Sequence, residues 1–169
     1  MDNFRSTELQ KAFWILKTHG DALLKARTLN KLLKGLSKLH TRNKREFDEL
    51  GVFEYCKICG QGPKKGCCLR EAGNWYDRYQ LLINLLLGAK IELNNDIEFC
   101  PFLGISGCTL VYRHEFCINF FCEEIKKAIG LKKIQYLRSI AGKEISEGLK
   151  IERYILKKLK ELCPQEVDI

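Results

Sequence analysis

Long apolar runs are missing from this sequence of 169 residues. The longest aliphatic stretch extends from Leu81 to Leu87, and Asn84 interrupts it. A helix that crosses a bilayer needs about 20 apolar residues, so this stretch is far too short. The sequence therefore predicts no membrane span.

The N-terminal segment lacks the pattern of a secretory leader, because residues 1–5 contain no basic start followed by an apolar run. We therefore expect a cytoplasmic protein. Thiols stay reduced in that compartment, and clustered cysteines there indicate metal or redox chemistry. A disulfide framework is the alternative reading of the same cysteines.

The motifs of several enzyme classes are also absent. The sequence contains no Walker-type phosphate loop, no dinucleotide-binding glycine fingerprint and no G-x-S-x-G elbow. A cysteine–histidine dyad would need one activated thiol beside a base, and the many cysteines give no reason to single one out. The sequence thus does not decide whether the chain is an enzyme.

Cysteine, by contrast, is abundant, and eight of the nine cysteines lie in the middle of the chain with the spacing C-x2-C-x7-CC followed by C-x7-C-x8-C-x4-C. Thiolates at such spacing can share a metal ion. Two sets of four match the coordination of zinc or of a [4Fe–4S] cluster. We predict as metal ligands Cys56, Cys59, Cys67, Cys68, Cys100, Cys108, Cys117 and Cys122.

The ligand type does not choose between zinc and an iron–sulfur cluster, since both accept four thiolates. Adjacent residues such as Cys67 and Cys68 rarely bind one mononuclear ion together, because their Cβ vectors diverge. We therefore expect upstream sulfurs to join downstream ones, which would tie residues 56–68 to residues 100–122. His114 is the one histidine candidate, with a surface or supporting role as the alternative. Cys163 stands apart and is expected to be a free thiol.

The formal charge of +8 would invite a nucleic-acid partner. Eight thiolates with two divalent zinc ions would reduce this charge to about half, so part of the basic excess compensates an anionic metal centre. The lysines are also scattered rather than gathered in one arm. These points argue against nucleic acid, and the sequence names no protein partner or small-molecule ligand.

The hydrophobic pattern predicts a mainly α fold, a helical bundle around an irregular cysteine-rich metal-binding core with at most one short hairpin or strand. The sequence predicts a helix break at Gly20-Asp21 and a surface loop or exposed helix end at residues 41–45. It also predicts a knuckle-like loop at residues 55–60 and a short strand at residues 109–112. Asn74 is the predicted cap of the third helix, and Gly142 and Gly148 are candidate breaks in the last one. The predicted helices cover 6–19, 22–39, 74–87, a segment ending at 129, and 131–162.

Three regions follow from this pattern. Residues 1–50 form an N-terminal helical segment, residues 51–130 form the cysteine-cluster region, and residues 131–169 form a C-terminal helical segment. We expect the three to make one compact domain, because the length suits a single core.

The downstream half of the array resembles the YkgJ-like cysteine-cluster family, which is described as a putative zinc- or iron-chelating domain. The resemblance rests on Cys100-Pro101-Phe102-Leu103, Gly107-Cys108, Tyr112, Cys117 and Cys122, and Cys56, Cys59, Cys67 and Cys68 match the family's opening. It covers roughly residues 52–125 and implies the eight cysteines as zinc or iron ligands. Arg113-His114 stands where the family typically has an Arg-Pro pair. Flagellin lysine methylases are similar in this cysteine pattern, so methylation is a minor alternative.

We therefore expect a cytoplasmic metal-binding protein that holds zinc or an iron–sulfur cluster through clustered thiolates. The alternative is an iron–sulfur redox enzyme or electron-transfer protein with its substrate at the cluster. A zinc-dependent nucleic-acid-binding module is a minor alternative.

Overall fold

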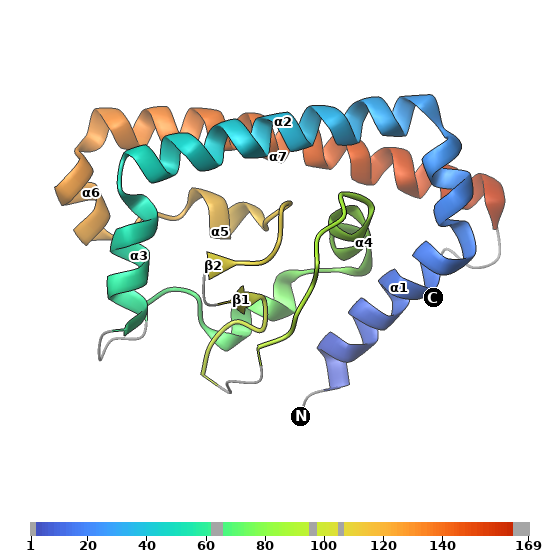
Figure 1. Cartoon of the computed structure of the whole chain (residues 1–169), viewed down its shortest axis with the longest axis horizontal. Coiled ribbons are helices and arrows are strands. Elements are labelled where there is room, and N and C mark those ends of the chain that lie inside the picture. Colours follow the sequence, from blue (N-terminus) through green and yellow to red (C-terminus); the bar gives the residue numbers. More distant parts are fainter. Residues whose placement is uncertain (1–2, 62–65, 95–97, 105–106, 164–169) are drawn as a thin grey trace.

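The structure is a computed structural model that describes residues 3–61, 66–94, 98–104 and 107–163. Two long helices, α2 and α7, lie side by side along the length of the molecule, and the shorter elements are arranged on one side of this pair (Figure 1). The elements are α1 (Asn3–Lys25), α2 (Arg27–Glu49), α3 (Val52–Gln61), the 3-10 helix η1 (Arg70–Trp75), α4 (Arg78–Leu86), β1 (Leu103–Gly104), β2 (Gly107–Cys108), α5 (Glu115–Asn119), α6 (Glu123–Ile129) and α7 (Leu131–Leu162).

The mainly α fold class is confirmed, and the only sheet among the described residues is the antiparallel pair of β1 and β2. The cysteine-rich core is not confirmed, because Cys100 is the one buried cysteine among those whose side chains are described. No described helix combines the length and the apolar character that a bilayer crossing requires.

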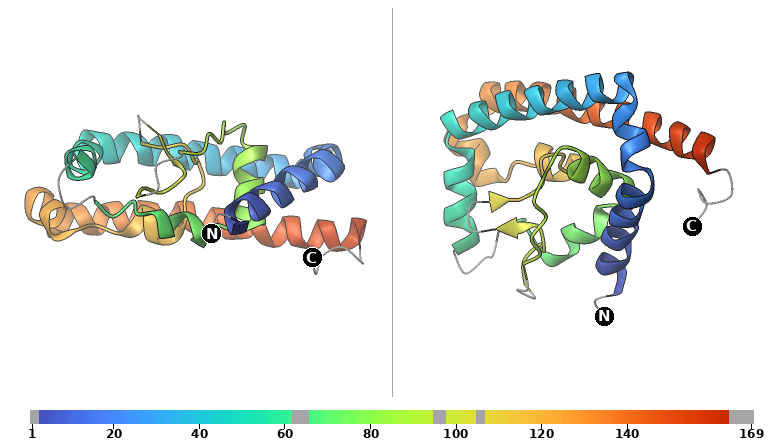
Figure 2. Two further views of the ribbon diagram at one scale, coloured as in Figure 1. Left: turned by 90° about the horizontal axis from the view of Figure 1, so that it is seen from below. Right: turned by 45° about the vertical axis from the view of Figure 1, so that its right-hand side comes forward.

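The long helix pair joins two separate groups of buried apolar residues. The first core cluster lies against α1 and α4, which pack together (Figure 2), and against the second half of α7. The second core cluster includes residues of α2, α3, α5, α6 and the first half of α7. Members of the first cluster include Leu29, Leu33, Leu36, Leu82, Phe102, Ile151 and Ile155, and members of the second include Phe47, Val52, Ile118, Phe121, Ile134, Leu137 and Ile140.

A buried polar group separates the two clusters on the long helices. The Asn43 side chain donates to Glu144 Oε2 at 2.7 Å and to the carbonyl of Ile140 at 3.0 Å. His40 Nδ1 lies 3.2 Å from the other oxygen of Glu144. Because buried polar groups are costly unless they are paired, these contacts fix the register of α2 against α7.

The last predicted helix is confirmed at both ends. The helix α7 begins at Leu131, directly after Gly130 with its φ of 87°, and ends at Leu162. Neither Gly142 nor Gly148 divides it. Its apolar residues recur at helical spacing over both core clusters, and packing outweighs the cost of about 1 kcal/mol that each glycine adds.

The predicted end of the first helix and start of the second were wrong. The break at Gly20 does not occur, and α1 continues to Lys25 before Ala26 turns to an extended conformation. Residues 41–45, expected as a surface loop or exposed helix end, lie inside α2, where Asn43 is buried against α7. At Asn43, tertiary packing thus decides the conformation over local preference.

Two predictions in the cysteine region were also wrong. Residues 55–60, expected as a knuckle-like loop, lie in α3, which Val52 and Phe53 pack onto the second core cluster. The expected strand at 109–112 is not a strand, and the hairpin instead pairs Leu103 with Cys108.

The predicted start of the third helix was displaced. The helix α4 begins at Arg78, and the Asp77 side chain caps it by accepting from the N–H groups of Tyr79 and Gln80, both at 2.8 Å. Asn74 therefore does not act as the cap of α4. Trp75 lies in η1 and is 40% exposed.

Candidate metal centre

Two cysteine-bearing segments from different parts of the chain lie side by side. The backbone N–H of Cys100 donates to the carbonyl of Cys68 at 2.9 Å. Leu69 and Phe99 then form an isolated antiparallel bridge. This pairing brings Cys67 and Cys68 beside Cys100, although α4 separates them in sequence. The backbones of the upstream and downstream segments are therefore in contact at this point, and a metal shared by their sulfurs stays a prediction.

The hairpin of β1 and β2 adds a further cysteine. The N–H of Leu103 donates to the carbonyl of Cys100 at 2.9 Å, which turns the chain into β1. The antiparallel register of β1 and β2 places Leu103 opposite Cys108. Thr109 returns along the hairpin, since its N–H donates to the carbonyl of Phe102 at 2.8 Å. Phe102 is buried in the first core cluster and so anchors the hairpin.

Tyr76 links this hairpin to α5, which carries Cys117. Its hydroxyl accepts the backbone N–H of His114 at 2.9 Å and hydrogen-bonds to the Cys117 sulfur. Its ring packs against Phe102 with 5.1 Å between ring centroids. Tyr76 thus sets the start of α5 relative to the hairpin.

Asn84 fixes the chain between the hairpin and α5. Its amide group donates to the carbonyl of Tyr112, and its oxygen accepts the N–H of Tyr112, both at 2.9 Å. Asn84 is fully buried in α4, so this pair replaces the water that both backbone groups lose. Tyr112 also donates its hydroxyl to Glu152 of α7 at 2.7 Å.

These segments bring five thiols into electrostatic contact. Hydrogen bonding to Cys67, burial, and the charges of Cys67, Cys100 and Cys108 all raise the pKa of Cys68. Burial raises the pKa of Cys117 most strongly, and Cys108 and Cys67 add to it. We call Cys67, Cys68, Cys100, Cys108 and Cys117 the five-cysteine group.

Within this group, Cys67 differs from its neighbours. The hydrogen bond from the Cys68 thiol lowers the pKa of Cys67 from 9.0 to about 7, against the opposing effect of burial. Desolvation by the surrounding protein raises the pKa of Cys108, although a backbone hydrogen bond from Leu110 and the charge of Arg113 act in the opposite direction. The pKa of Cys67 therefore lies near neutral pH.

Arg113 places a cation beside the group. Its charge lowers the pKa of both Cys108 and Cys117. Its Nε and Nη2 atoms are buried and have no hydrogen-bond partner among the described residues. The guanidinium also lies over the ring of Phe47, 5.9 Å from the centroid. A buried guanidinium stays charged, so it favours anions close by.

Three predicted ligands lie outside the five-cysteine group. Cys56 is exposed on α3, and the side chain of Cys59 lies outside the described residues. Cys122 is half-buried as the N-cap residue of α6, where burial raises its pKa most strongly and Glu124 raises it further. The helices α3 and α6 both contribute to the second core cluster.

The histidine candidate has a structural contact. His114 accepts the N–H of Phe116 through Nδ1 at 3.2 Å and so caps α5. Its ring packs on Trp75 with 5.4 Å between centroids, and burial lowers its pKa. The Cys163 sulfur, which the sequence predicts to be apart from the cysteine array, lies 3.4 Å from His19 Nε2.

Within the described part of the chain, no three Cys, His, Asp or Glu side chains are close enough together to hold a metal ion as they stand. The donor set itself still suits a soft metal, because it combines several thiols with the Arg113 guanidinium, whose buried Nε and Nη2 have no hydrogen-bond partner among the described residues. Loading a metal would require the sulfurs to converge.

Sequence reasoning missed Tyr76, Asn84 and the position of Arg113. A polar residue inside the aliphatic run 81–87 was the available signal for Asn84, since such a residue needs a buried partner. Tyr76 and Arg113 carried no comparable signal, because their roles depend on segments that only the fold brings together.

No family model, no curated protein and no solved structure matches this chain. The resemblance to the YkgJ-like family therefore rests on the cysteine spacing.

Proposed function

We propose that this chain is a metal-binding protein that holds zinc or an iron–sulfur cluster through the thiolates of the five-cysteine group. The observation that carries the proposal is Arg113, whose buried Nε and Nη2 lack hydrogen-bond partners among the described residues beside Cys108 and Cys117. Buried N–H groups that lack an acceptor are costly, and a thiolate–metal centre would supply the missing negative charge.

Four of the five sulfurs suffice for a tetrahedral zinc ion or for one cubane cluster. Cys67 and Cys68 are adjacent, so we assign only one of them to a mononuclear ion together with Cys100, Cys108 and Cys117. Binding draws the sulfurs together and releases their protons, because only thiolates ligate. A bound zinc ion would supply structural stability, whereas a bound cluster would supply an electron.

Cys56, Cys59 and Cys122 remain the proposed ligands of a second site. Cys56 lies on α3 and Cys122 precedes α6 as its N-cap residue, and both helices contribute to the second core cluster. The cytoplasm is the proposed compartment, because reduced thiols persist there.

The redox alternative differs from the zinc version in its spectrum. An iron–sulfur protein purified without air should be brown and should bleach when reduced, whereas a zinc protein should be colourless. The nucleic-acid alternative predicts retention of RNA or DNA at about physiological salt. The metal proposal predicts that the protein retains neither RNA nor DNA at this salt concentration.

Metal analysis of protein purified without air tests the proposal. We expect the Cys108→Ser variant to lose metal relative to wild type, because a serine hydroxyl is a poor ligand for a soft metal. The matched control is Cys163→Ser, which should keep the wild-type metal content, since Cys163 contacts His19 at the end of α7. Wild-type protein that stays free of metal after reconstitution would refute the proposal.

The Arg113 variants test the observation itself. Arg113→Gln removes the positive charge and should weaken metal affinity by about 10- to 100-fold, as the loss of other supporting partners does. Arg113→Lys keeps a charge and should weaken it less. Equal affinity in Arg113→Gln and wild type, measured by competition with a chelator, would show that Arg113 does not face a metal centre.

A further inference from the structure

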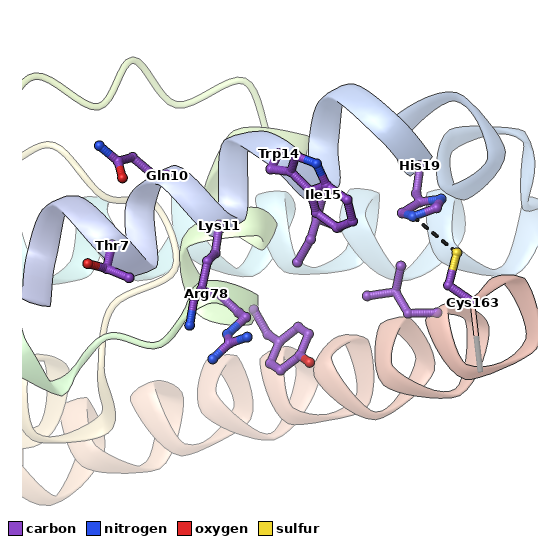
Figure 3. Close-up of a pocket in the computed structure, with 10 residues that line it drawn as sticks. Thr7, Gln10, Lys11, Trp14, Ile15, His19, Arg78 and Cys163 are labelled. Carbon is purple, nitrogen blue, oxygen red and sulfur yellow. Dashed lines mark hydrogen bonds between the residues drawn. The ribbon is translucent and has the colours of Figure 1, made fainter. Parts of the chain in front are cut away.

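A cavity of about 320 Å³ lies away from the cysteines, between α1, α4 and the C-terminal end of α7 (Figure 3). This volume falls at the lower end of the range for small-molecule sites. Such sites combine a mostly apolar wall with a few polar groups at defined points, and this cavity has that composition.

One end of the cavity carries positive charge. Lys11 of α1 and Arg78 of α4 line it and share a single carboxylate, that of Glu8. Arg78 Nε lies 3.1 Å and Lys11 Nζ lies 3.5 Å from the Glu8 oxygens. Two cations against one buried carboxylate leave one positive charge, which suits a monoanionic head group better than a dianion.

The middle of the cavity is apolar. Ile15 is buried and Trp14 is 47% exposed, and both lie on the side of α1 that lines the cavity (Figure 3). Leu159 of α7 and Tyr79 of α4 complete this part of the wall. An exposed indole beside aliphatic side chains favours an apolar body of a ligand.

The other end holds a sulfur and an imidazole. Cys163 Sγ lies 3.4 Å from His19 Nε2, and the His19 ring meets Trp14 edge-on with 5.8 Å between centroids (Figure 3). A ligand that extends from the apolar middle to this end would cover the thiol, so the reactivity of Cys163 reports occupancy.

We propose that this cavity binds a small amphipathic carboxylate. The carboxylate lies at Lys11 and Arg78, and its apolar part lies along Trp14 and Leu159 toward Cys163. The site shares no residue with the five-cysteine group, so its occupancy does not depend on metal.

The test uses octanoate as the probe and the alkylation of Cys163 by iodoacetamide as the readout, followed by peptide mass spectrometry on the full chain. Octanoate should slow alkylation of Cys163, whereas octylammonium, with an equal chain and opposite charge, should not. Cys56, exposed on α3, is the internal reference and should react at an unchanged rate.

Two lysine variants of α1 separate charge recognition from simple hydrophobic binding. Lys11→Gln should raise the octanoate concentration for half-protection by about tenfold, the effect of losing one charge-assisted hydrogen bond. Lys17→Gln removes a lysine of the same helix that does not line the cavity and should match wild type. Equal protection by octylammonium, an unchanged Lys11→Gln response, or no protection up to about 10 mM octanoate would overturn the proposal.

Discussion

Cys67 and Cys68 are neighbours in the chain, yet their shared hydrogen bond drives their thiols to opposite states. It lowers the pKa of Cys67 to about 7 and raises that of Cys68. Near pH 7, Cys67 is therefore partly ionised, whereas Cys68 stays a thiol. A thiolate is the nucleophile and the metal ligand, so Cys67 is the first contact we expect for an incoming metal.

Removal of the Cys68 donor should change the reactivity of Cys67. In metal-free protein, Cys68→Ala should raise the pKa of Cys67 toward its ordinary value of 9.0 and slow its alkylation at pH 7, because less thiolate is present. Cys68→Ser keeps a hydroxyl donor and should stay closer to wild type. The measurement is the rate of iodoacetamide modification of Cys67 against pH, and equal profiles for both variants would contradict it.

The single residues that build the candidate site differ in how far the sequence revealed them. The cysteines were visible by their spacing, and the contact of the upstream and downstream loops followed from the adjacent pair. Tyr76 and Arg113 act on sulfurs from distant segments, so no local pattern marks them. Metal ligation by any of these cysteines stays a prediction.

At the scale of elements, α7 was predictable because its apolar residues recur with a helical period over a long segment, and because Gly130, at positive φ, precedes the helix. The C-x2-C segment was not, because its helix α3 depends on the packing of Val52 and Phe53 in the second core cluster. Similarly, α4 starts at an Asp77 cap that the earlier Asn74 signal obscured. Local signals fail where distant side chains decide.

Gly148 shows how α7 accommodates the chain beside the site. A Cβ at this position would lie 2.0 Å from Tyr112 Cε2, so only glycine leaves room for the ring. We expect Gly148→Ala to lower the free energy of unfolding by about 2 kcal/mol or more through overpacking. Denaturant unfolding of the variant and the wild type measures this difference in the free energy of unfolding.

Gly142 is the matched control on the same helix. A Cβ there meets nothing within 4 Å, so Gly142→Ala should stabilise the protein by about 0.5–1 kcal/mol through helix propensity. If both variants changed stability alike, the close approach of Tyr112 to Gly148 would be wrong.

At the scale of the whole molecule, two kinds of structure stand side by side. The pair of α2 and α7 has continuous helical hydrogen bonding and a buried polar group that fixes its register. The cysteine segments are instead joined by isolated backbone contacts such as the N–H of Cys100 to the carbonyl of Cys68. The helical frame should therefore be the more stable part, and the metal-binding segments the less stable one.

Metal loading should stabilise these segments selectively. We expect amide hydrogen exchange to slow by at least about tenfold at Cys100, Leu103 and Thr109, because a ligand that binds only the ordered form protects it. Exchange within the middle of α2 and α7 should change less. Mass spectrometry or NMR with and without zinc measures this, and uniform slowing along the chain would contradict it.

The contact between α2 and α7 joins residues 97 positions apart, as the bond from Asn43 to the carbonyl of Ile140 shows. During synthesis a ribosome completes the eight-cysteine array before it makes α7. The nascent chain thus presents its thiols while half of its helical frame is still missing. A metal ion or a thiol-protecting chaperone that acts at this stage meets an open chain, and the time to reach α7 sets how long the cysteines stay exposed to oxidation.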